Sequence, residues 1–416
     1  MDGVDGVDGA TDSFLIEGAQ VFDGHRFLPP GVLLVVDGRI AAVGTRLTPP
    51  AGTPVIAAQG GTVLPGLVDA HVHVHPGALQ AALRSGVTTE LDMFADPALV
   101  RSLRRQASSD PGMADLRSAG TGATAPGGHP TALVDRGLLA PFPTVAGPRD
   151  AEAFVADRVA EGSDHLKIVL EDGATTGRPC PSLTADTVRA LVLAAHARGL
   201  LVVAHALTRA HALLAVDAGV DGLAHLFVDE PASQEFLDAA ARRDVFVVPT
   251  LTSLAARAGR SRGPALAADP YLGPGIDRGQ RALLETDFPV GPGARADLDI
   301  AMSTVGRLHR AGVALLAGTD ASSPGVAHGV SLHDELDLLV QAGLPPAAAL
   351  AAATSAPAVA FRLDDRGTLA PGRRADLVLV DGDPGHDITR TRAVRAVWRN
   401  GRRATGPQVA SAAGPA

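Results

Sequence analysis

The sequence predicts an α/β fold in which parallel βα units close into a (β/α)8 barrel, with β-rich segments at both ends of the chain. Between residue 63 and about residue 360, short apolar runs that end in polar residues alternate with alanine-rich stretches of helical spacing. Eight such runs are present, and eight parallel strands are the number that closes this kind of barrel. The runs are LPGLVDAHVH, GVTTELDMF, ADLRSAGTGA, DHLKIVLE, LLVVAHA, GLAHLF, VFVVPT and VALLAGTD.

The two chain ends show short strand-like segments in place of the alternation of strand-like runs and helical stretches in the middle. Residues 1–12 carry the repeat DGVDGVDG without apolar periodicity, and we expect a flexible tail there. Turn residues then separate short strand-like segments, which are FLIEGAQVF, VLLVVDG, RIAAVG and TPVIAAQ. The same pattern returns in ADLVLVDGD and AVRAVWRNGR.

Helices are expected between the runs. Two candidates, TADTVRALVLAAHARG and TRAHALLAVDAG, each end in a glycine suited to the position after a helix. The segment 253–300 is an unusually long connection between the seventh and eighth runs. In a barrel it would lie at the catalytic face, so it is either a lid or substrate loop or a helical excursion without a binding role.

Composition excludes several classes of protein. The 416 residues carry 36 Lys and Arg against 45 Asp and Glu, a net charge of −9, and no basic block that would favour nucleic acid. The charge-free stretches 47–68 and 338–361 are interrupted by Pro and Gly, so neither predicts a membrane helix. With one cysteine, Cys180, and no signal-peptide pattern at the start, we expect a cytoplasmic protein with a small-molecule substrate. The sequence leaves the oligomeric state open, and a homo-oligomer is compatible with it.

A single lysine stands out among the basic residues. The chain has 35 arginines and one lysine, Lys167. Arginine replaces lysine easily on a solvated surface, but it cannot supply a primary amine that loses its proton. Lys167 is therefore a candidate functional residue, with chance survival as the alternative.

Polar residues that could bind a metal ion lie within or near the ends of five of the eight runs. Strand alternation puts His71 and His73 on the same side, and the ends of parallel barrel strands converge at one mouth. Four imidazoles and a carboxylate there would form a ligand set suited to Zn²⁺ or a similar divalent ion, although an isolated buried histidine is usually a core residue. The marked residues are His71, His73, Lys167, His205, His225 and Asp320.

This order of His-x-His, Lys, His, His and Asp resembles the amidohydrolase superfamily of metal-dependent hydrolases. The resemblance rests on VLPGLVDAHVHVHPG, HLKIVLEDG, VVAHALT and LLAGTDAS, and GTLAPGRRADLVLVDGDP is similar to the returning strands of the family's small β-sandwich. PGGHP at 126–130 and HGVSLHDELDLLVQAG at 328–343 point to the prolidase-like and imidazolonepropionase-like branch. The resemblance implies a TIM-like barrel over 63–361, a β-sandwich domain from 13–62 plus 362–405, and tails at 1–12 and 406–416.

The resemblance also implies a binuclear site. His71, His73 and Asp320 would bind one ion, His205 and His225 the other, and Lys167, carboxylated by CO₂, would bridge both. Zn²⁺ is the expected metal, with Mn²⁺, Co²⁺ or Fe²⁺ as alternatives. A metal-bridging hydroxide would attack the substrate carbonyl, and Asp320 would carry the proton to the departing nitrogen.

Further residues are assigned around this site. His129, in PGGHP, matches a histidine that positions the substrate carbonyl in the prolidase-like branch. Arg178 and Tyr271 are candidates to contact a substrate carboxylate or ring.

The other histidines near the runs are expected outside the ligand set. We expect His75 and His165 to be structural or packing residues, and His328 and His333 to lie on the rim. Cys180 receives no role.

The leading functional prediction is hydrolysis of an amide-type C–N bond in an N-acyl amino acid, a dipeptide or a related amide. A lactone, ester or carbamate hydrolase on the same two metals is an alternative. So is a mononuclear deaminase-type hydrolase, against which Lys167 argues because one metal needs no bridge. A non-catalytic scaffold would lack ligands, and none is missing here.

Overall fold

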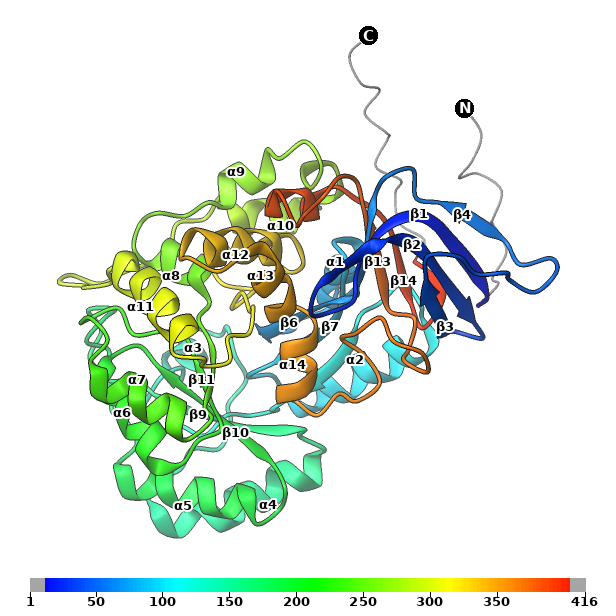
Figure 1. The fold of residues 1–416 in the computed structure, drawn as a ribbon. Helices are drawn as coiled ribbons and strands as arrows, with labels where there is room; N and C mark the ends of the chain where they lie inside the picture. Colours follow the sequence, from blue (N-terminus) through cyan, green and yellow to red (C-terminus); the bar gives the residue numbers. More distant parts are fainter. Residues whose placement is uncertain (1–11, 405–416) are drawn as a thin grey trace.

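The computed structural model describes residues 12–404. The predicted tails, 1–12 and 406–416, lie outside the described part of the chain, apart from Asp12. In the described part, helices and strands alternate as an α/β fold (Figure 1). The predicted fold class is thereby confirmed at the level of α/β.

One mixed sheet joins the two ends of the chain. Its order is β15-β14-β13-β5-β1-β2-β3, with β4 paired to β1, and in Figure 1 the blue N-terminal strands lie beside the red C-terminal ones. Phe14 and Trp398 stack in its core with ring centroids 5.3 Å apart. The strands are β1 Phe14–Phe22, β2 Phe27–Val36, β3 Arg39–Gly44, β4 Val55–Ala57, β5 Thr62–Pro65, β13 Leu377–Val380, β14 Val394–Arg399 and β15 Arg402–Arg403.

The expected boundary between the two domains runs through this sheet. The sequence places it between residues 62 and 63, yet β5 spans Thr62–Pro65 and pairs with β1 and β13. Residues 62–65 therefore belong to the sheet of the chain ends, and β6 is the first strand of the sheet that also contains β7 and β8.

Seven of the eight predicted runs contain strands, which form two parallel sheets. The first has the order β6-β7-β8 and the second β12-β11-β10-β9. The strands are β6 Leu67–Val72, β7 Val87–Asp92, β8 Asp115–Ser118, β9 His165–Leu170, β10 Leu201–Ala206, β11 Gly222–Ala224 and β12 Phe246–Val248.

The eighth run connects the two sheets without forming a named strand. It makes isolated parallel bridges on both sides, Val247 with Leu315 and Val72 with Ala321. A third bridge, Ala123 with Ile168, joins the chain after β8 to β9. Within the run, the backbone N–H of Ala317 donates to the Ala352 carbonyl and not to a neighbouring strand, and Asp320, the last residue of the run, takes a left-handed φ of 64°.

Helices occupy the connections between the parallel strands. The predicted helix after β9 is α5, where the Thr184 side chain caps the backbone N–H of Thr187, and α6 ends at Gly219, whose φ is 92°. The helices that follow the strands and the eighth run include α1 Ala78–Arg84, α2 Pro97–Ser109, α4 Ala151–Glu161, α5 Ala185–His196, α6 Arg209–Ala218, α7 Gln234–Arg242, α11 Leu298–Arg310, α12 Val330–Gln341, α13 Pro346–Ala352 and α14 Ser355–Ala360.

Short helices occupy the rest, including the long segment 253–300. They are α3 Ala132–Asp135, η1 Pro148–Asp150, α8 Leu251–Arg257, α9 Gly263–Ala267, η2 Gly273–Gly275, α10 Arg278–Leu284 and η3 Ile388–Arg392.

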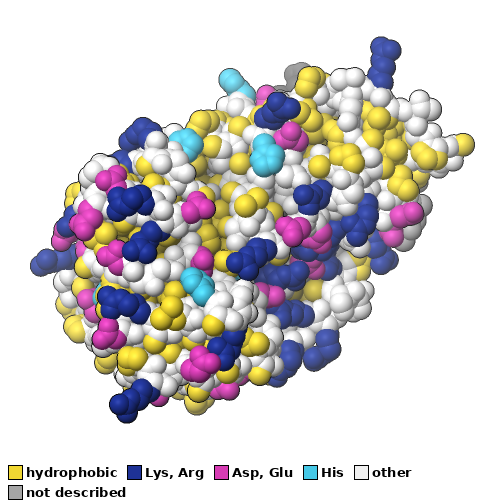
Figure 2. Space-filling view, turned by 60° about the horizontal axis from the view of Figure 1, so that its bottom comes forward, with side chains coloured by type: hydrophobic (Ala, Val, Ile, Leu, Met, Phe, Trp, Pro, Cys, Tyr) yellow, Lys and Arg dark blue, Asp and Glu magenta, His cyan; other side chains and the backbone are white. Residues whose placement is uncertain are grey.

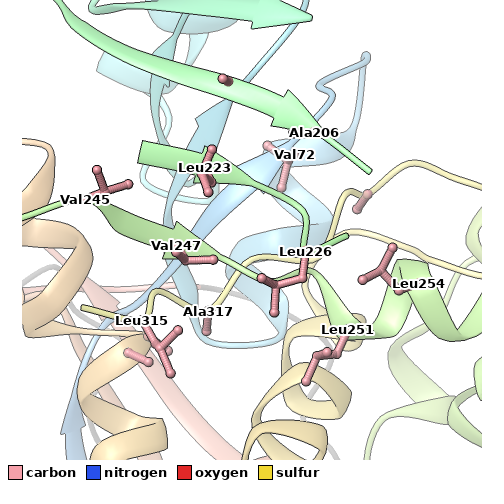
Figure 3. Packing of buried hydrophobic residues seen from close by; sticks show 14 of the residues in the cluster. Val72, Ala206, Leu223, Leu226, Val245, Val247, Leu251, Leu254, Leu315 and Ala317 are labelled. Carbon is pink, nitrogen blue, oxygen red and sulfur yellow. The ribbon is translucent and has the colours of Figure 1, made fainter. Parts of the chain in front are cut away.

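The core packs around the strands that carry the polar run ends. Leu223 of β11, Val247 of β12 and Leu315 of the eighth run lie close together and are fully or nearly fully buried (Figure 3). On the surface drawn in Figure 2, basic and acidic side chains are interspersed with apolar ones. Among residues 12–404, no helix is both long and apolar enough to cross a bilayer.

Candidate metal centre

His71, His73 and Asp320 meet where the first and eighth runs end. His71 lies on β6, His73 follows that strand, and Asp320 follows the eighth run. Nε2 of His73 is 3.0 Å and Nε2 of His71 is 3.4 Å from Oδ1 of Asp320. The two histidines that the sequence assigns to one ion with Asp320 therefore both face the same oxygen of its carboxylate.

His205 and His225 continue the cluster across the parallel strands. The ring of His225 lies 4.7 Å from the ring of His71 and 4.7 Å from the ring of His205, measured between centroids. One ligand atom each from His71, His225 and Asp320 lie within 4.8 Å of one another, which is a spacing that a single ion can bridge.

The outer nitrogens of two of these histidines are fixed by hydrogen bonds. Nε2 of His205 lies 3.2 Å from Oε2 of Glu171, and Nδ1 of His225 lies 2.7 Å from Oγ1 of Thr250. Such partners orient an imidazole and leave its other nitrogen free for an ion. Glu171 follows Lys167 by four residues within the fourth run and comes directly after the C-terminal end of β9.

Lys167 projects from β9 into a buried environment. Its side chain is 3% exposed, and Nζ has no hydrogen-bond partner among the described residues. Burial lowers the pKa of this amine to about 7, so the neutral form is accessible near neutral pH. A buried amine without a partner is costly, and a group that binds it would remove that cost.

The protonation states suit metal binding. Burial is the main cause that lowers the pKa of His71, His205 and His225, so these imidazoles are neutral at pH 7. Both ring nitrogens of His71 are buried without a hydrogen-bond partner in the described structure. Burial would raise the pKa of Asp320, but the surrounding histidines hold it well below its usual range.

Several residues of the histidine–aspartate cluster and its neighbours have a strained, left-handed backbone conformation. Residues 12–404 contain eight non-glycine residues with positive φ, and three of them are His225 at 69°, Thr250 at 52° and Asp320 at 64°. Left-handed backbone is costly for residues with a Cβ and is found where a fixed side-chain direction is needed. For Thr250, a β-branched residue, the cost is greater.

His129 lies beside the cluster and remains exposed. Its ring stacks on that of His205, with centroids 5.6 Å apart and an angle of 29° between the ring planes. An exposed imidazole at the edge of a buried donor cluster can reach a bound molecule. Arg178 is exposed and Tyr271 half-buried, and neither has a described contact with the histidines within residues 12–404.

Two histidines expected on the rim are buried instead, so that expectation was wrong. Nδ1 of His328 lies 2.7 Å from Oε1 of Glu90 and its Nε2 lies 3.2 Å from the backbone oxygen of His73. His333 contacts the Ser85 carbonyl at 2.9 Å and Oγ1 of Thr391 at 3.1 Å. His328 lies just before helix α12 and contacts Glu90 on β7, whereas His333 lies on α12 itself.

The remaining two histidines lie outside the ligand cluster, as expected. His165 is buried and packs edge-on against the ring of Phe361, at 5.2 Å between centroids. His75 is exposed, and its Nδ1 lies 2.9 Å from the carbonyl oxygen of Pro76.

Side chains from α8 reach Asp320 and were not identified from the sequence. Oγ of Ser253 donates to Oδ2 of Asp320 at 2.8 Å, and Nη2 of Arg257 lies 3.5 Å from the same oxygen. Both residues stand at the start of the 253–300 segment, whose length was the only signal in the sequence. The beginning of that segment is therefore part of the site.

The comparison with family models decides the identity of the chain. The model described as the amidohydrolase family matches residues 62–405. This chain belongs to the amidohydrolase family. The resemblance inferred from the motifs is confirmed, and the amidohydrolase is an enzyme, a hydrolase of the class that acts on carbon–nitrogen bonds.

Named relatives of this amidohydrolase agree with that assignment. It is 30% identical over 419 residues to the imidazolonepropionase of Deinococcus deserti, covering 90% of this chain and 92% of the relative. Over 98 residues it is 40% identical to an adenine deaminase of Paracoccus denitrificans, covering 21% of this chain and 16% of the relative.

Solved structures share the fold over nearly the full chain. A Xaa-Pro dipeptidase with bound methionine superposes with a TM-score of 0.76 at 24% identity, covering 95% of this chain and all of that one. The ochratoxinase of A. niger gives a TM-score of 0.74 at 20% identity, covering 96% and 97% of the two chains. These neighbours imply a TIM-barrel fold for this chain.

Proposed function

We propose that this amidohydrolase cleaves an amide-type C–N bond in an N-acyl amino acid, a dipeptide or a related amide, using two divalent metal ions. The observation that carries the proposal is the convergence of ligand atoms of His71, His225 and Asp320 within 4.8 Å, together with the buried amine of Lys167, which has no partner in the described part of the chain. The family assignment supports hydrolysis, and the donor set supports the metal requirement.

The residues present fit a pair of ions. His71, His73 and Asp320 would hold one ion, and His205 and His225 the other, with carboxylated Lys167 between them. Among residues 12–404, the ring nitrogens of His71 and Nζ of Lys167 have no hydrogen-bond partner, which supports this because buried polar atoms otherwise find partners. Neutral imidazoles and carboxylates suit Zn²⁺ first, and also Mn²⁺, Co²⁺ or Fe²⁺.

Divalent ions bound there would supply Lewis-acid polarisation of a carbonyl and a nucleophile from water at neutral pH. The side chains of this enzyme then have to move one proton. Asp320 suits that role because Oδ1 faces His71 and His73, while Oδ2 accepts a hydrogen bond from Ser253 and is held in place. Asp320 would take a proton from the attacking water and give it to the departing nitrogen, without which an amine is a poor leaving group.

His129 is proposed to orient the substrate. Its exposed ring stacks on His205, so it can donate a hydrogen bond to the oxygen of a carbonyl that approaches the cluster. Correct placement of the carbonyl is what allows a fixed donor to accelerate the reaction.

We also propose how the fold builds this site. The two parallel sheets and the eighth run would form a closed (β/α)8 barrel over the region 63–361, and the bridges of Val247 with Leu315 and Val72 with Ala321 support the closure. The sheet of the two chain ends would be the small β-sandwich domain, formed by 13–62 plus 362–405. Barrel strand ends then provide every ligand of the site.

A substrate panel tests the proposed activity. Enzyme purified without chelator should hydrolyse at least one N-acyl amino acid or dipeptide, and lose this activity after metal removal. Asp320→Asn should lower kcat by about 10²- to 10⁴-fold, which is the usual contribution of a proton-transferring residue. Asp299→Asn, a change to an exposed carboxylate, is the matched control. Turnover of lactones or purines without any turnover of amides would contradict the proposal.

A further inference from the structure

Arg257 is a half-buried cation beside the proposed proton-transferring carboxylate. It ends helix α8, and its side chain is 12% exposed. Ser253 lies one turn earlier on the same helix face, and both side chains approach Oδ2 of Asp320. The guanidinium therefore lies next to the reacting centre and not on the outer surface.

The position of Arg257 is fixed from two sides. The backbone N–H groups of Leu251 and Thr252 donate to the Glu335 carboxylate at 3.0 and 2.8 Å, which anchors the start of α8. On the other side, the ring of Phe288 lies 4.2 Å from the guanidinium carbon. This cation–π contact holds the plane of the guanidinium while leaving its edge for hydrogen bonds.

The segment that carries Phe288 is itself tied to the loop after β9. The backbone N–H of Gly291 donates to the Thr176 carbonyl at 2.8 Å, and that of Arg295 donates to the Thr175 carbonyl at 3.0 Å. The cover over Arg257 is thus attached to the part of the barrel that also carries Lys167 and Glu171.

The hydrogen-bonding capacity of Arg257 is almost unused. A guanidinium has five N–H donors, yet the contact with Asp320 is at 3.5 Å, and Nε is buried without a partner in the described structure. Asp320 does not need this donor, because Oδ2 already accepts from Ser253 at 2.8 Å and from Ser323 at 3.3 Å. A shielded cation with free donors is stabilised by an anion that binds two of them at once.

We infer that Arg257 binds the carboxylate of the substrate, on the leaving-group side of the scissile amide. This inference rests on the proposed function, because the side is set by the role of Asp320. The carboxylate that protonates the departing nitrogen has to lie next to that nitrogen, and Arg257 lies against this carboxylate. The substrate class is then an N-acylated α-amino acid or a dipeptide with a free terminal carboxylate, in which the anionic group is one carbon from the nitrogen.

The experiment compares each N-acetyl-L-amino acid of a panel with its carboxamide, and follows release of acetate from both. The variant Arg257→Met keeps an apolar stem against Phe288 and removes the guanidinium. Arg260→Met is the control, since Arg260 is exposed and pairs with Asp299 at 2.7 Å.

We expect the parent enzyme to prefer carboxylate over carboxamide by at least about tenfold in kcat/KM, as charge-assisted hydrogen bonds allow. In Arg257→Met, the ratio of kcat/KM for the carboxylate substrate to kcat/KM for its carboxamide should fall by about 10- to 100-fold, with the loss carried by a higher KM for the carboxylate substrate, while Arg260→Met keeps the ratio of the parent. Equal losses for both substrates would mean that Arg257 only supports Asp320 and would overturn the inference. Absence of any preference in the parent would overturn it as well.

Two further measurements distinguish failure of the assignment of Arg257 from failure of the proposed amide hydrolysis. Inorganic phosphate is tested as a competitor, and inhibition by phosphate that exceeds inhibition by the free amino acid product in the parent and is lost in Arg257→Met would assign Arg257 to a phosphate and overturn the carboxylate. Calorimetric titration with the N-acetyl-L-amino acids does not depend on turnover. If no amide is cleaved, the proposed function fails, yet binding that is lost only in Arg257→Met still supports the anchor, and absence of binding to the parent overturns it.

Discussion

His73 and Asp320 are 247 positions apart in the chain, yet Nε2 of one lies 3.0 Å from Oδ1 of the other. The bridge between Val72 and Ala321 brings the two runs together immediately beside this contact. The first and last parallel runs thus meet at the donor cluster, and the cluster exists only when the chain is fully folded. Substitutions in the contact between the first and eighth runs should therefore affect metal binding and stability together.

A substitution of Gly318 tests whether close packing between the first and eighth runs is needed for metal binding and stability. A Cβ at this position would lie 2.5 Å from Cγ1 of Val248 and 2.8 Å from the backbone nitrogen of His71. Gly318→Ala should therefore displace His71, lower the free energy of unfolding by about 1–3 kcal/mol and weaken metal binding. Urea unfolding and metal titration measure the two effects. Gly147→Ala is the control, since a Cβ there meets nothing within 4 Å; equal behaviour of both variants would contradict the account.

A substitution of Glu171 tests whether its hydrogen bond holds His205 in position to bind a metal ion. Glu171→Gln keeps the shape of the side chain but removes the charge that accepts from the imidazole at 3.2 Å. Loss of such a partner typically lowers metal affinity by about 10- to 100-fold. Competition with a metal-binding dye should show this decrease, and Glu152→Gln, at an exposed position on α4, should show none. An unchanged affinity in Glu171→Gln would exclude His205 from the ligand set.

Asp115 tests how the sheet of the chain ends is joined to the parallel strands. Its carboxylate on β8 accepts from Arg366, Arg374 and Arg399, all from the C-terminal part of the chain. Burial raises the pKa of Asp115, but Arg374, Arg366 and Arg399 together hold it well below its usual range. Asp115→Asn leaves three cations without their shared anion and should lower the free energy of unfolding by about 3 kcal/mol at pH 7.

The pH dependence of that loss has a defined sign. A carboxylate whose pKa is lower in the folded state stabilises the fold above its unfolded pKa of about 4, and this contribution decreases as the pH falls further. The difference between parent and Asp115→Asn, measured by urea unfolding, should be constant from pH 7 to pH 5 and become smaller below about pH 4. A difference that grows toward low pH would contradict this reading. Asp299→Asn provides a surface-pair control.

Much of the site could be predicted from the sequence because strand ends converge in an α/β fold. His71, His73, Lys167, His205, His225 and Asp320 each follow or lie within a strand-like run, and the structure gathers the histidines around Asp320. Strand alternation and parallel topology are local rules, so they can be read from residue order alone. The strands β1 and β3 likewise coincide with their predicted segments.

The features that were missed depend on long-range packing. Ser253 and Arg257 face Asp320 only because Glu335, more than 80 positions from their helix start, anchors α8. His328 is buried because Glu90, 238 positions away, accepts from it. Within the eighth run the N–H of Ala317 bonds to the carbonyl of Ala352, 35 positions later, and apolar periodicity does not reveal such a partner or the left-handed φ of Asp320 at the end of the run.

The central claim is that Lys167 completes a site for two ions. Elemental analysis of protein purified without chelator should give two metals per chain for the parent and at most one for Lys167→Arg and Lys167→Met, with circular dichroism unchanged. Arginine keeps the charge and methionine keeps the stem, but neither can be carboxylated. Two metals per chain in both variants would contradict a bridging role for Lys167, and a single metal in the parent would contradict the binuclear site itself.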